Sequence, residues 1–386
     1  MKMMRTGTVL AAGVSAWCAV AMESGREWED QAKLHAGKEA PVAAFASFPT
    51  VEEAKGIRSE LCSRRVCLDS ETDWRFSYST RPEDRPVGFQ NPSFDVSAWD
   101  IVKVPCSWQA MGINRAGKPY GHPYYTNANW PFVAKFPANS NSWPRVRGLY
   151  KPADFTMKDD ENPVGCYRRD FTVPADWTGD EVYLEFGAVD SFFYLWVNGR
   201  YVGFSKSSRD PARFNVTAFV KPGANTVALE VYRFSDASYL EAQDMLLMSG
   251  IARSVWLFHV PKTHIRDVFF TTAPVRKGDY AGDWKLDLRT DVVGGNADVK
   301  AHVFDADGDE VPNAGLVFRS PKLWSAECPN LYTLVLELVQ DGRTLEAVGF
   351  QLGFREVEIR DAANQNDRTF LLNGQPIKMR GANRHE

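Results

Sequence analysis

The sequence has little helical periodicity. In its 386 residues the best candidate for a helix is residues 48–58, and no segment carries a continuous apolar stripe over four turns. An excess of basic charge is also absent, because 45 Lys and Arg stand against 49 Asp and Glu and the net charge is −4. This balance offers no electrostatic footprint for nucleic acid or for an acidic membrane surface, so we exclude both as partners.

Cysteine is scarce and irregularly spaced. Five of the six cysteines would remain after removal of the N-terminal segment described below. These are Cys62, Cys67, Cys106, Cys166 and Cys328. An odd number with scattered spacing argues against a disulfide framework, although a bond between Cys62 and Cys67 in an oxidising compartment stays open. Without a CxxC pair or a histidine cluster, the sequence does not indicate a structural zinc site.

The N-terminus has the composition of a secretory signal. Lys2 and Arg5 form a basic start, residues 9–21 are apolar and small, and the run ends on Ala19-Val20-Ala21. We predict a signal peptide at residues 1–21, cleaved after Ala21, and therefore a periplasmic or secreted protein. The run is too short for a membrane span, which needs about 20 apolar residues. An uncleaved apolar tail is the alternative; a lipid-modified Cys18 is disfavoured by the bulky residue before it.

Apolar and aromatic residues are abundant. They make up 44% and 13% of the sequence, which is typical of a globular chain. Short runs alternate apolar with polar residues, the pattern of strands with one buried face. They lie at residues 74–80, 167–174, 181–189, 192–205, 225–234, 283–293, 297–311, 330–339 and 343–359. Turn signals separate many of them: Asn198-Gly199, Pro222-Gly223, Asp307-Gly308, Asp341-Gly342 and Asn373-Gly374. Many short strands with such turns predict an all-β sandwich or barrel.

A domain boundary is predicted near Pro261, where one series of strands ends and another begins. We expect an N-terminal arm at residues 22–44, a first sandwich at 45–260, a second and smaller sandwich at 261–359, and a third piece at 360–386. Between residues 308 and 322 the second sandwich is short of strands, which would leave an unpaired edge. We therefore expect local disorder or a swapped edge there, and a poorly ordered tail from about residue 361.

Several longer motifs occur in a particular order. They include "VPCSWQAMG" (104–112), "ENPVGCYRRDF" (161–171), "LWVNGRYVGFSKSSRDPARFNVTAF" (195–219), "SYLEAQDM" (238–245), "MSGIARSV" (248–255), "PKLWSAECPNLY" (321–332) and "FLLNGQPIKMRGANRHE" (370–386). In order and spacing they make the chain resemble the N-terminal part of the bacterial β-galactosidases of glycoside hydrolase family two, over about residues 25–386. The resemblance implies a mainly β fold: a jelly-roll-like sugar-binding sandwich, a shortened immunoglobulin-like β-sandwich, then the first strand of an incomplete (β/α)8 barrel.

The resemblance also implies three substrate-binding positions. The histidine of the family's NRHE motif lines the galactosyl pocket, which assigns this role to His385 at the end of "PIKMRGANRHE", the expected first barrel strand. Ser107 stands where many relatives have an asparagine that reaches the sugar. Ser207 stands where they have an aspartate that contacts galactose and sodium, and a serine keeps the hydroxyl but loses the charge. Leu246 likewise replaces a usual tryptophan. Read without the resemblance, residues 383–386 are a polar strand end that orders a loop.

Catalytic residues are not expected in this chain. Retaining glycosidases need two carboxyl groups roughly 5–5.5 Å apart; in the family both are glutamates on later barrel strands, as are the principal magnesium ligands. The glutamates of the second sandwich read as carboxylates on exposed strand faces. These are Glu310, Glu327, Glu337, Glu346, Glu356 and Glu358. No cofactor is therefore expected in this chain, while the resemblance implies magnesium and sodium, and a homo-oligomer, for a full-length relative.

Two functional hypotheses follow. The first is an N-terminal fragment of a retaining β-galactosidase-like glycoside hydrolase, acting on β-galactosides or related oligosaccharides and inactive alone. The second is a stand-alone carbohydrate-binding or complementing module, in which exposed aromatic side chains stack on sugar rings. Candidates for such stacking are Trp108, Tyr124, Tyr125 and Trp130. For these four residues core packing is the competing explanation.

Overall fold

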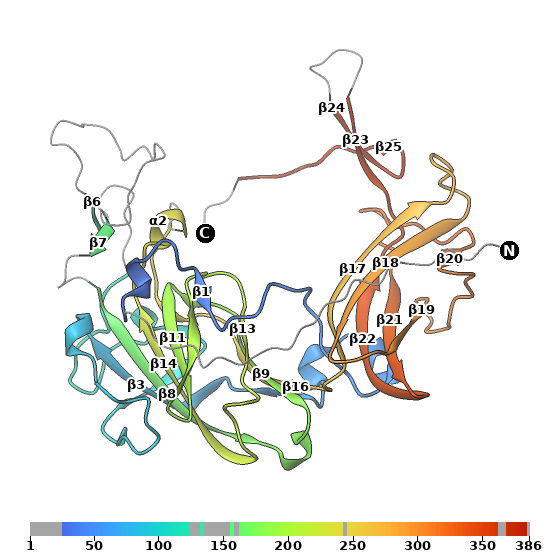
Figure 1. Ribbon diagram of the computed structural model, residues 1–386. Coiled ribbons are helices and arrows are strands. Elements are labelled where there is room, and N and C mark those ends of the chain that lie inside the picture. Colours follow the sequence, from blue (N-terminus) through green and yellow to red (C-terminus); the bar gives the residue numbers. More distant parts are fainter. Residues whose placement is uncertain are drawn as a thin grey trace.

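The computed structural model describes residues 25–123, 132–134, 155–157, 162–241, 245–361 and 368–383. The predicted signal peptide and its cleavage site at Ala21 lie outside these residues. Nearly all regular structure in the described residues is β, arranged as two sandwiches (Figure 1). The two short α-helices are α1 (Val51–Lys55) and α2 (Ser238–Glu241). Among the described residues, no helix has the length and apolarity needed to cross a membrane.

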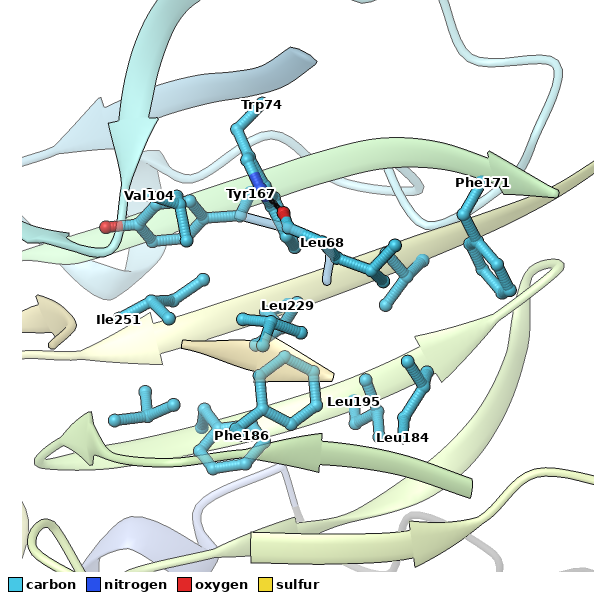
Figure 2. Close-up of a cluster of buried hydrophobic side chains, with 14 of the residues drawn as sticks. Leu68, Trp74, Val104, Tyr167, Phe171, Leu184, Phe186, Leu195, Leu229 and Ile251 are labelled. Carbon is cyan, nitrogen blue, oxygen red and sulfur yellow. Dashed lines mark hydrogen bonds between the residues drawn. The ribbon is translucent and has the colours of Figure 1, made fainter. Parts of the chain in front are cut away.

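The first sandwich is built on a seven-stranded antiparallel sheet in the order β1-β12-β11-β14-β8-β3-β4. Its strands are β1 (His35–Ala36), β3 (Ser70–Ser79), β4 (Asp100–Val104), β8 (Val164–Val173), β11 (Phe192–Val197), β12 (Arg200–Ser205) and β14 (Gly223–Tyr232). The facing sheet has the order β13-β9-β16-β2, with β2 (Arg65–Cys67), β9 (Glu181–Phe186), β13 (Ala212–Asn215) and β16 (Val255–Val260). Side chains of both sheets form one buried core, which Figure 2 shows with Leu195 and Leu229 beside Leu184 and Phe186.

The outer face of the seven-stranded sheet is buried as well. A second cluster of buried side chains lies there, in which Trp28 stacks on Tyr232 with ring centroids 5.2 Å apart. The adjacent Glu27 is buried and accepts a hydrogen bond from the Tyr194 hydroxyl. All six residues of β11 are consequently buried. The prediction that residues 192–205 have only one buried face is wrong for β11, because the N-terminal segment covers the other face.

The second sandwich packs two three-stranded sheets, β17-β18-β20 and β19-β21-β22. Its strands are β17 (His264–Pro274), β18 (Trp284–Val293), β19 (Asp298–Phe304), β20 (Val317–Phe318), β21 (Tyr332–Gln340) and β22 (Arg343–Leu352). The region expected to be disordered or swapped instead contains β20, which pairs with β18 at Trp284 and Lys285. Phe318 is fully buried in the core. This apolar anchor holds the segment against the sheet and covers part of the β18 edge.

Residues 46–62 lie in sequence between β1 and β2, two strands of the first sandwich, but pack on the second sandwich. Ala46, Phe48, Ala54 and Cys62 form a buried cluster with side chains of β19, β21 and β22. Helix α1 begins after Thr50, whose hydroxyl accepts the Glu53 amide at 3.2 Å. The chain then returns to the first sandwich through β2, so this segment ties the two sandwiches together (Figure 1).

Close approach of α1 to β22 explains a glycine in that strand. A Cβ at Gly349 would lie 2.1 Å from the Ala54 carbonyl oxygen, so a larger residue would push the helix away from the sheet. Glycine is the residue that permits this backbone contact.

One of the six glutamates expected on exposed strand faces is fully buried. Glu346 accepts hydrogen bonds from the Ser47 hydroxyl and the Ile265 backbone amide, and Arg64 donates to the same Ser47 hydroxyl at 2.9 Å. Burial raises the pKa of Glu346, while the hydrogen bond from Ser47 opposes the rise. The surface prediction is therefore wrong for Glu346, because strand β22 turns this side chain toward the junction of three segments.

The described C-terminal residues form a small sheet of β23 (Val357–Asp361), β24 (Arg368–Leu372) and β25 (Gln375–Pro376). Residues 377–383 contain no strand. Of the segment "PIKMRGA", predicted as the first barrel strand, only Pro376 lies in a strand, the end of β25 beside β24. The Ile377 amide still donates to the Phe370 carbonyl oxygen of β24 at 3.1 Å, and the described residues that follow have no strand partner. His385 lies outside the described residues.

The predicted hairpin turns are confirmed at three sites. Both central residues have positive φ at Asn198-Gly199 (52° and 77°), Asp341-Gly342 (51° and 75°) and Asn373-Gly374 (49° and 72°), as a primed turn requires. The five described cysteines are all free. Cys62 is buried with its thiol 3.1 Å from the Ser47 carbonyl oxygen, and Cys67 is exposed. The disulfide between Cys62 and Cys67, which the sequence left undecided, is therefore not formed in the structure.

The remaining elements are short. They are β5 (Cys106–Ser107), β6 (Phe132–Ala134), β7 (Phe155–Met157), β10 (Val189–Asp190) and β15 (Gly250–Ile251), and the 3-10 turns Glu27–Glu29, Ser59–Leu61, Pro82–Asp84, Trp108–Ala110 and Ala175–Trp177. The three strands β10, β15 and β5 pair in that order and carry one of the predicted site residues.

Candidate functional site

Ser107 ends β5 and is half-buried. It pairs with Gly250 of β15, and Gly250 pairs in turn with Asp190 of β10. Gly250 has φ of +123°, and a Cβ there would lie 2.9 Å from the Tyr167 hydroxyl and 3.0 Å from the Cys106 carbonyl oxygen. A glycine at this position thus lets the three short strands meet. Neighbouring strands of a sheet lie about 4.8 Å apart, and β5 is separated from β10 by β15 alone. The backbones of Ser107 and Asp190 therefore lie within about 10 Å of each other.

Ser207 lies in the loop that follows β12 and is also half-buried. Its hydroxyl donates to Asp210 Oδ2 at 2.7 Å. Two residues further on, the Arg209 guanidinium lies 3.7 Å from Asp190 Oδ2. The structure therefore places both predicted serines in the neighbourhood of Asp190, Ser107 through the short strands and Ser207 through its own loop.

Buried and half-buried carboxylates surround the Ser207 loop. Glu241 of α2 accepts the Ser208 backbone amide at 2.9 Å and also the Ser208 hydroxyl. Lys206 is buried and forms an ion pair with Asp236 at 2.8 Å. Burial raises the pKa of Asp190 to about 6, with Arg209 opposing the rise. Burial also raises the pKa of Glu241, opposed by its hydrogen bonds from Ser208.

Two nearby carboxyl groups with raised pKa invite comparison with a glycosidase pair. The cavity lined by Asp190 and Glu241 measures only about 20 Å³, which is the space of a single water molecule. Both oxygens of Glu241 are occupied by Ser208. A sugar cannot enter between these groups, so their arrangement orders a loop and does not form a catalytic pair.

The aromatic candidates do not form a sugar platform in the described structure. Trp108 is fully buried and packs against Phe76 and Tyr78. The core explanation therefore holds for Trp108, and the stacking prediction is wrong for it. Tyr124, Tyr125 and Trp130 lie outside the described residues.

Sequence reasoning missed Asp190, Asp210 and Glu241 as neighbours of the predicted serines. Asp190 and Glu241 lie 83 and 134 residues from Ser107 along the chain, so no local spacing relates them. The available signal was the polar stretch 206–210, in which every residue carries a polar side chain directly after a hydrophobic strand. Polar side chains that are removed from water need hydrogen-bond or ionic partners, and the fold supplies these as the carboxylates of Asp190, Asp236 and Glu241.

Of the metal sites that the resemblance implies, only the sodium-linked position, that of Ser207, falls on described residues. No group of three or more His, Cys, Asp or Glu side chains in the described part of the chain could hold a metal ion. At the sodium-linked position, the Ser207 hydroxyl is engaged with Asp210. We derive no step through a metal.

The sheets define a structural class, a chain of two joined β-sandwiches. The family description "Glycosyl hydrolases family 2, sugar binding domain" matches residues 68–261, and "Glycosyl hydrolases family 2" matches residues 263–355. The chain therefore belongs to glycoside hydrolase family 2.

A curated relative and solved structures agree with this assignment. The chain is 34% identical to the β-galactosidase of Priestia megaterium in an alignment 367 positions long, which covers 89% of this chain and 32% of the relative. The chain thus spans about a third of that relative. A β-glucuronidase from Ruminococcus gnavus superposes with a TM-score of 0.60 at 17% identity, covering 82% of this chain and 48% of the other. A β-glycosidase from Bacteroides vulgatus gives 0.58 at 22% identity, covering 82% and 36%. These structures support the fold.

Proposed function

We propose that the chain is the N-terminal part of a retaining β-galactosidase-like glycoside hydrolase, which acts on terminal β-D-galactosides or related oligosaccharides in carbohydrate catabolism. The observation that carries this proposal is the 34% identity to a β-galactosidase in an alignment 367 positions long. The match to the sugar-binding domain of the family supports it.

In this proposal Ser107 and Ser207 contact the sugar, together with His385. Each serine offers one hydroxyl that donates and accepts hydrogen bonds. Their common location beside Asp190 supports the assignment. The catalytic acid/base and nucleophile glutamates belong to a part of the family's barrel that this chain does not match, so this chain supplies sugar contacts without the chemistry.

The chain alone is accordingly proposed to be inactive. Purified protein is mixed with a nitrophenyl β-galactoside, and we expect no hydrolysis above the buffer rate. A nitrophenyl β-glucuronide belongs in the same assay, because similar solved structures include β-glucuronidases. Turnover of either substrate would overturn the inactivity, and the substrate cleaved would show the sugar preference.

A stand-alone carbohydrate-binding or complementing module is the second proposal. It is favoured by the complete cores of both sandwiches, each of which buries its own cluster of apolar side chains. Titration calorimetry with galactosides and with β-glucans separates the two, since a module binds on its own and an incomplete enzyme does not. The burial of Trp108 leaves such a module without this stacking surface.

Two further properties belong to the proposal. Export to the periplasm or the medium would follow from cleavage after Ala21, and sequencing of the exported protein from its N-terminus would then begin at Met22. Homo-oligomerisation, and binding of magnesium and sodium, are proposed for a full-length relative. Light scattering of a full-length relative and of this chain would show which part carries the oligomer contacts.

A further inference from the structure

Acidic side chains from three separate segments hold the loop at residues 206–210. Lys206 pairs with Asp236, which follows β14. Ser208 is bound by Glu241 of α2, and Arg209 lies against Asp190 of β10. Between these anchored residues, Ser207 turns its hydroxyl to Asp210 within the loop itself. The predicted sugar contact thus lies between two anchored residues, Lys206 and Ser208.

Glu241 makes the most specific of these contacts. Its two carboxylate oxygens accept both donors of one residue, the backbone amide and the hydroxyl of Ser208. Charge-assisted hydrogen bonds of this kind are roughly twice as strong as neutral ones, and partial burial strengthens them further. Binding both donors fixes the backbone at Ser208, and hence the direction in which the preceding residue presents its side chain.

The element that carries Glu241 is itself well anchored. Helix α2 begins at Ser238, whose hydroxyl accepts the amide of Ser235, three residues earlier in the chain, at 3.0 Å; both serines are buried. The Glu241 amide donates to the Ala237 carbonyl oxygen at 3.0 Å. The carboxylate therefore projects from a short turn that these two hydrogen bonds hold, and it can support the loop.

We propose that Glu241 is a positioning residue, which sets the conformation of the 206–210 loop and thereby the direction of the Ser207 hydroxyl toward the sugar. Asp190 assists by holding Arg209. The inference rests on the proposed function only in treating Ser207 as a sugar contact; the positioning of the loop stands on the contacts themselves. Glu241 does not touch the sugar.

Hydrogen exchange of the full chain tests the positioning. Glu241→Ala removes both acceptors, and we expect the Ser208 amide to exchange at least about tenfold faster, since a broken hydrogen bond exposes the amide to solvent. Glu241→Gln retains a carbonyl oxygen for that amide and is expected to restore protection to within about threefold of wild type. Glu52→Ala, at an exposed glutamate of α1, is the matched control and should leave Ser208 unchanged.

The outcomes separate local positioning from general stability. Faster exchange at residues 207–209, with unchanged exchange in β11 and β14, supports the proposal. Unchanged exchange at Ser208 in Glu241→Ala overturns it, as does equal acceleration throughout the sandwich in both Glu241 variants. Should Glu241→Ala fail to fold, Ser208→Ala removes the hydroxyl contact while keeping the amide, and an unaltered amide protection pattern at 207 and 209 would then count against the proposal.

A titration with isopropyl β-D-thiogalactoside tests the sugar role separately. If wild type binds, we expect Glu241→Ala to weaken binding about tenfold and Glu241→Gln to bind nearly as wild type. Equal affinity of the Ala variant and wild type would overturn the link between the loop and the sugar. Absence of binding by wild type is the result expected of an incomplete enzyme, and the exchange experiment then decides the positioning by itself.

Discussion

In the first sandwich, strand β11 is buried along its whole length, whereas in the second sandwich β18 exposes alternate residues. Along β11, Phe193 belongs to the inner core and Phe192 and Tyr194 belong to the outer cluster. Along β18, Trp284 is buried and Lys285 is exposed. The period of two is the same in both strands. Alternation of apolar and polar residues appears in the sequence only where one face of a strand is exposed to water. The two sandwiches therefore differ in whether the outer face of the strand is covered by other residues.

Removing the cover of β11 should produce the largest effect. We expect Trp28→Ala to lower the free energy of unfolding by about 3–5 kcal/mol, because a large buried aromatic side chain is replaced by a cavity. Urea unfolding followed by tryptophan fluorescence and circular dichroism measures the change. Trp256→Ala, at a half-buried position on β16, is the control and should cost clearly less. A loss below about 1 kcal/mol for Trp28→Ala would show that the outer face does not depend on this cover.

The junction between the sandwiches should be the next most sensitive place. Glu346→Ala leaves the Ile265 amide and the Ser47 hydroxyl without their acceptor, and we expect a loss of about 2–3 kcal/mol. Glu327→Ala, at an exposed glutamate of the same sandwich, should change stability by less than about 0.5 kcal/mol. Calorimetry of the two variants checks this difference. Equal melting temperatures would contradict a structural role for the buried carboxylate.

Asp190 should make the first sandwich depend on pH in a way that an asparagine does not. Its folded-state pKa is raised to about 6, so the folded protein holds this proton more tightly than the unfolded chain. The protonated Asp190 therefore adds about 2–3 kcal/mol to the free energy of unfolding below about pH 4, and this contribution is lost as the pH rises through about 6. Relative to Asp190→Asn, wild type should therefore become less stable between pH 4 and 6 and then remain level. Urea titrations at four pH values measure the difference, and a rise with pH would contradict it.

The hairpin turns offer the smallest and most closely matched comparison. Asn198 and Asp341 both have φ near 50° in two-residue turns. The Asn198 side chain also donates to the Phe219 carbonyl oxygen at 2.9 Å and accepts the Thr226 amide at 3.0 Å. We expect Asn198→Ala to cost about 2 kcal/mol and Asp341→Ala about 1 kcal/mol, the latter from backbone conformation alone. Chemical denaturation of both variants tests this, and a larger cost at Asp341 would reverse the interpretation.

Much of the fold could be predicted from local pattern. The turn at Asn198-Gly199 and the strands around it follow from residues that are neighbours in sequence, because a primed turn requires residues that tolerate positive φ. The candidate site was predicted only in part. Ser107 and Ser207 were found through motifs, whereas Glu241 came into view only when the fold brought α2 beside the loop.

One error and one open alternative have a common physical origin. Glu346 was expected on the surface because a carboxylate is usually solvated, and for Trp108 the sequence left open both stacking on a sugar and packing in the core. Both are buried in the structure. Residues remote in sequence provide the hydrogen bonds for Glu346 and the apolar surroundings for Trp108, and burial of a polar or aromatic group depends on such partners.

The sequence by itself determined the strands, the turns and the family, because these depend on backbone preferences, on apolar alternation and on ordered motifs. Only the tertiary structure decided that residues 46–62 pack on the second sandwich and that β11 is covered on both faces. It also decided which carboxylates hold the Ser207 loop. These features depend on contacts between segments tens to hundreds of residues apart, and side-chain burial and hydrogen bonding across such separations are set by packing, which local sequence does not encode.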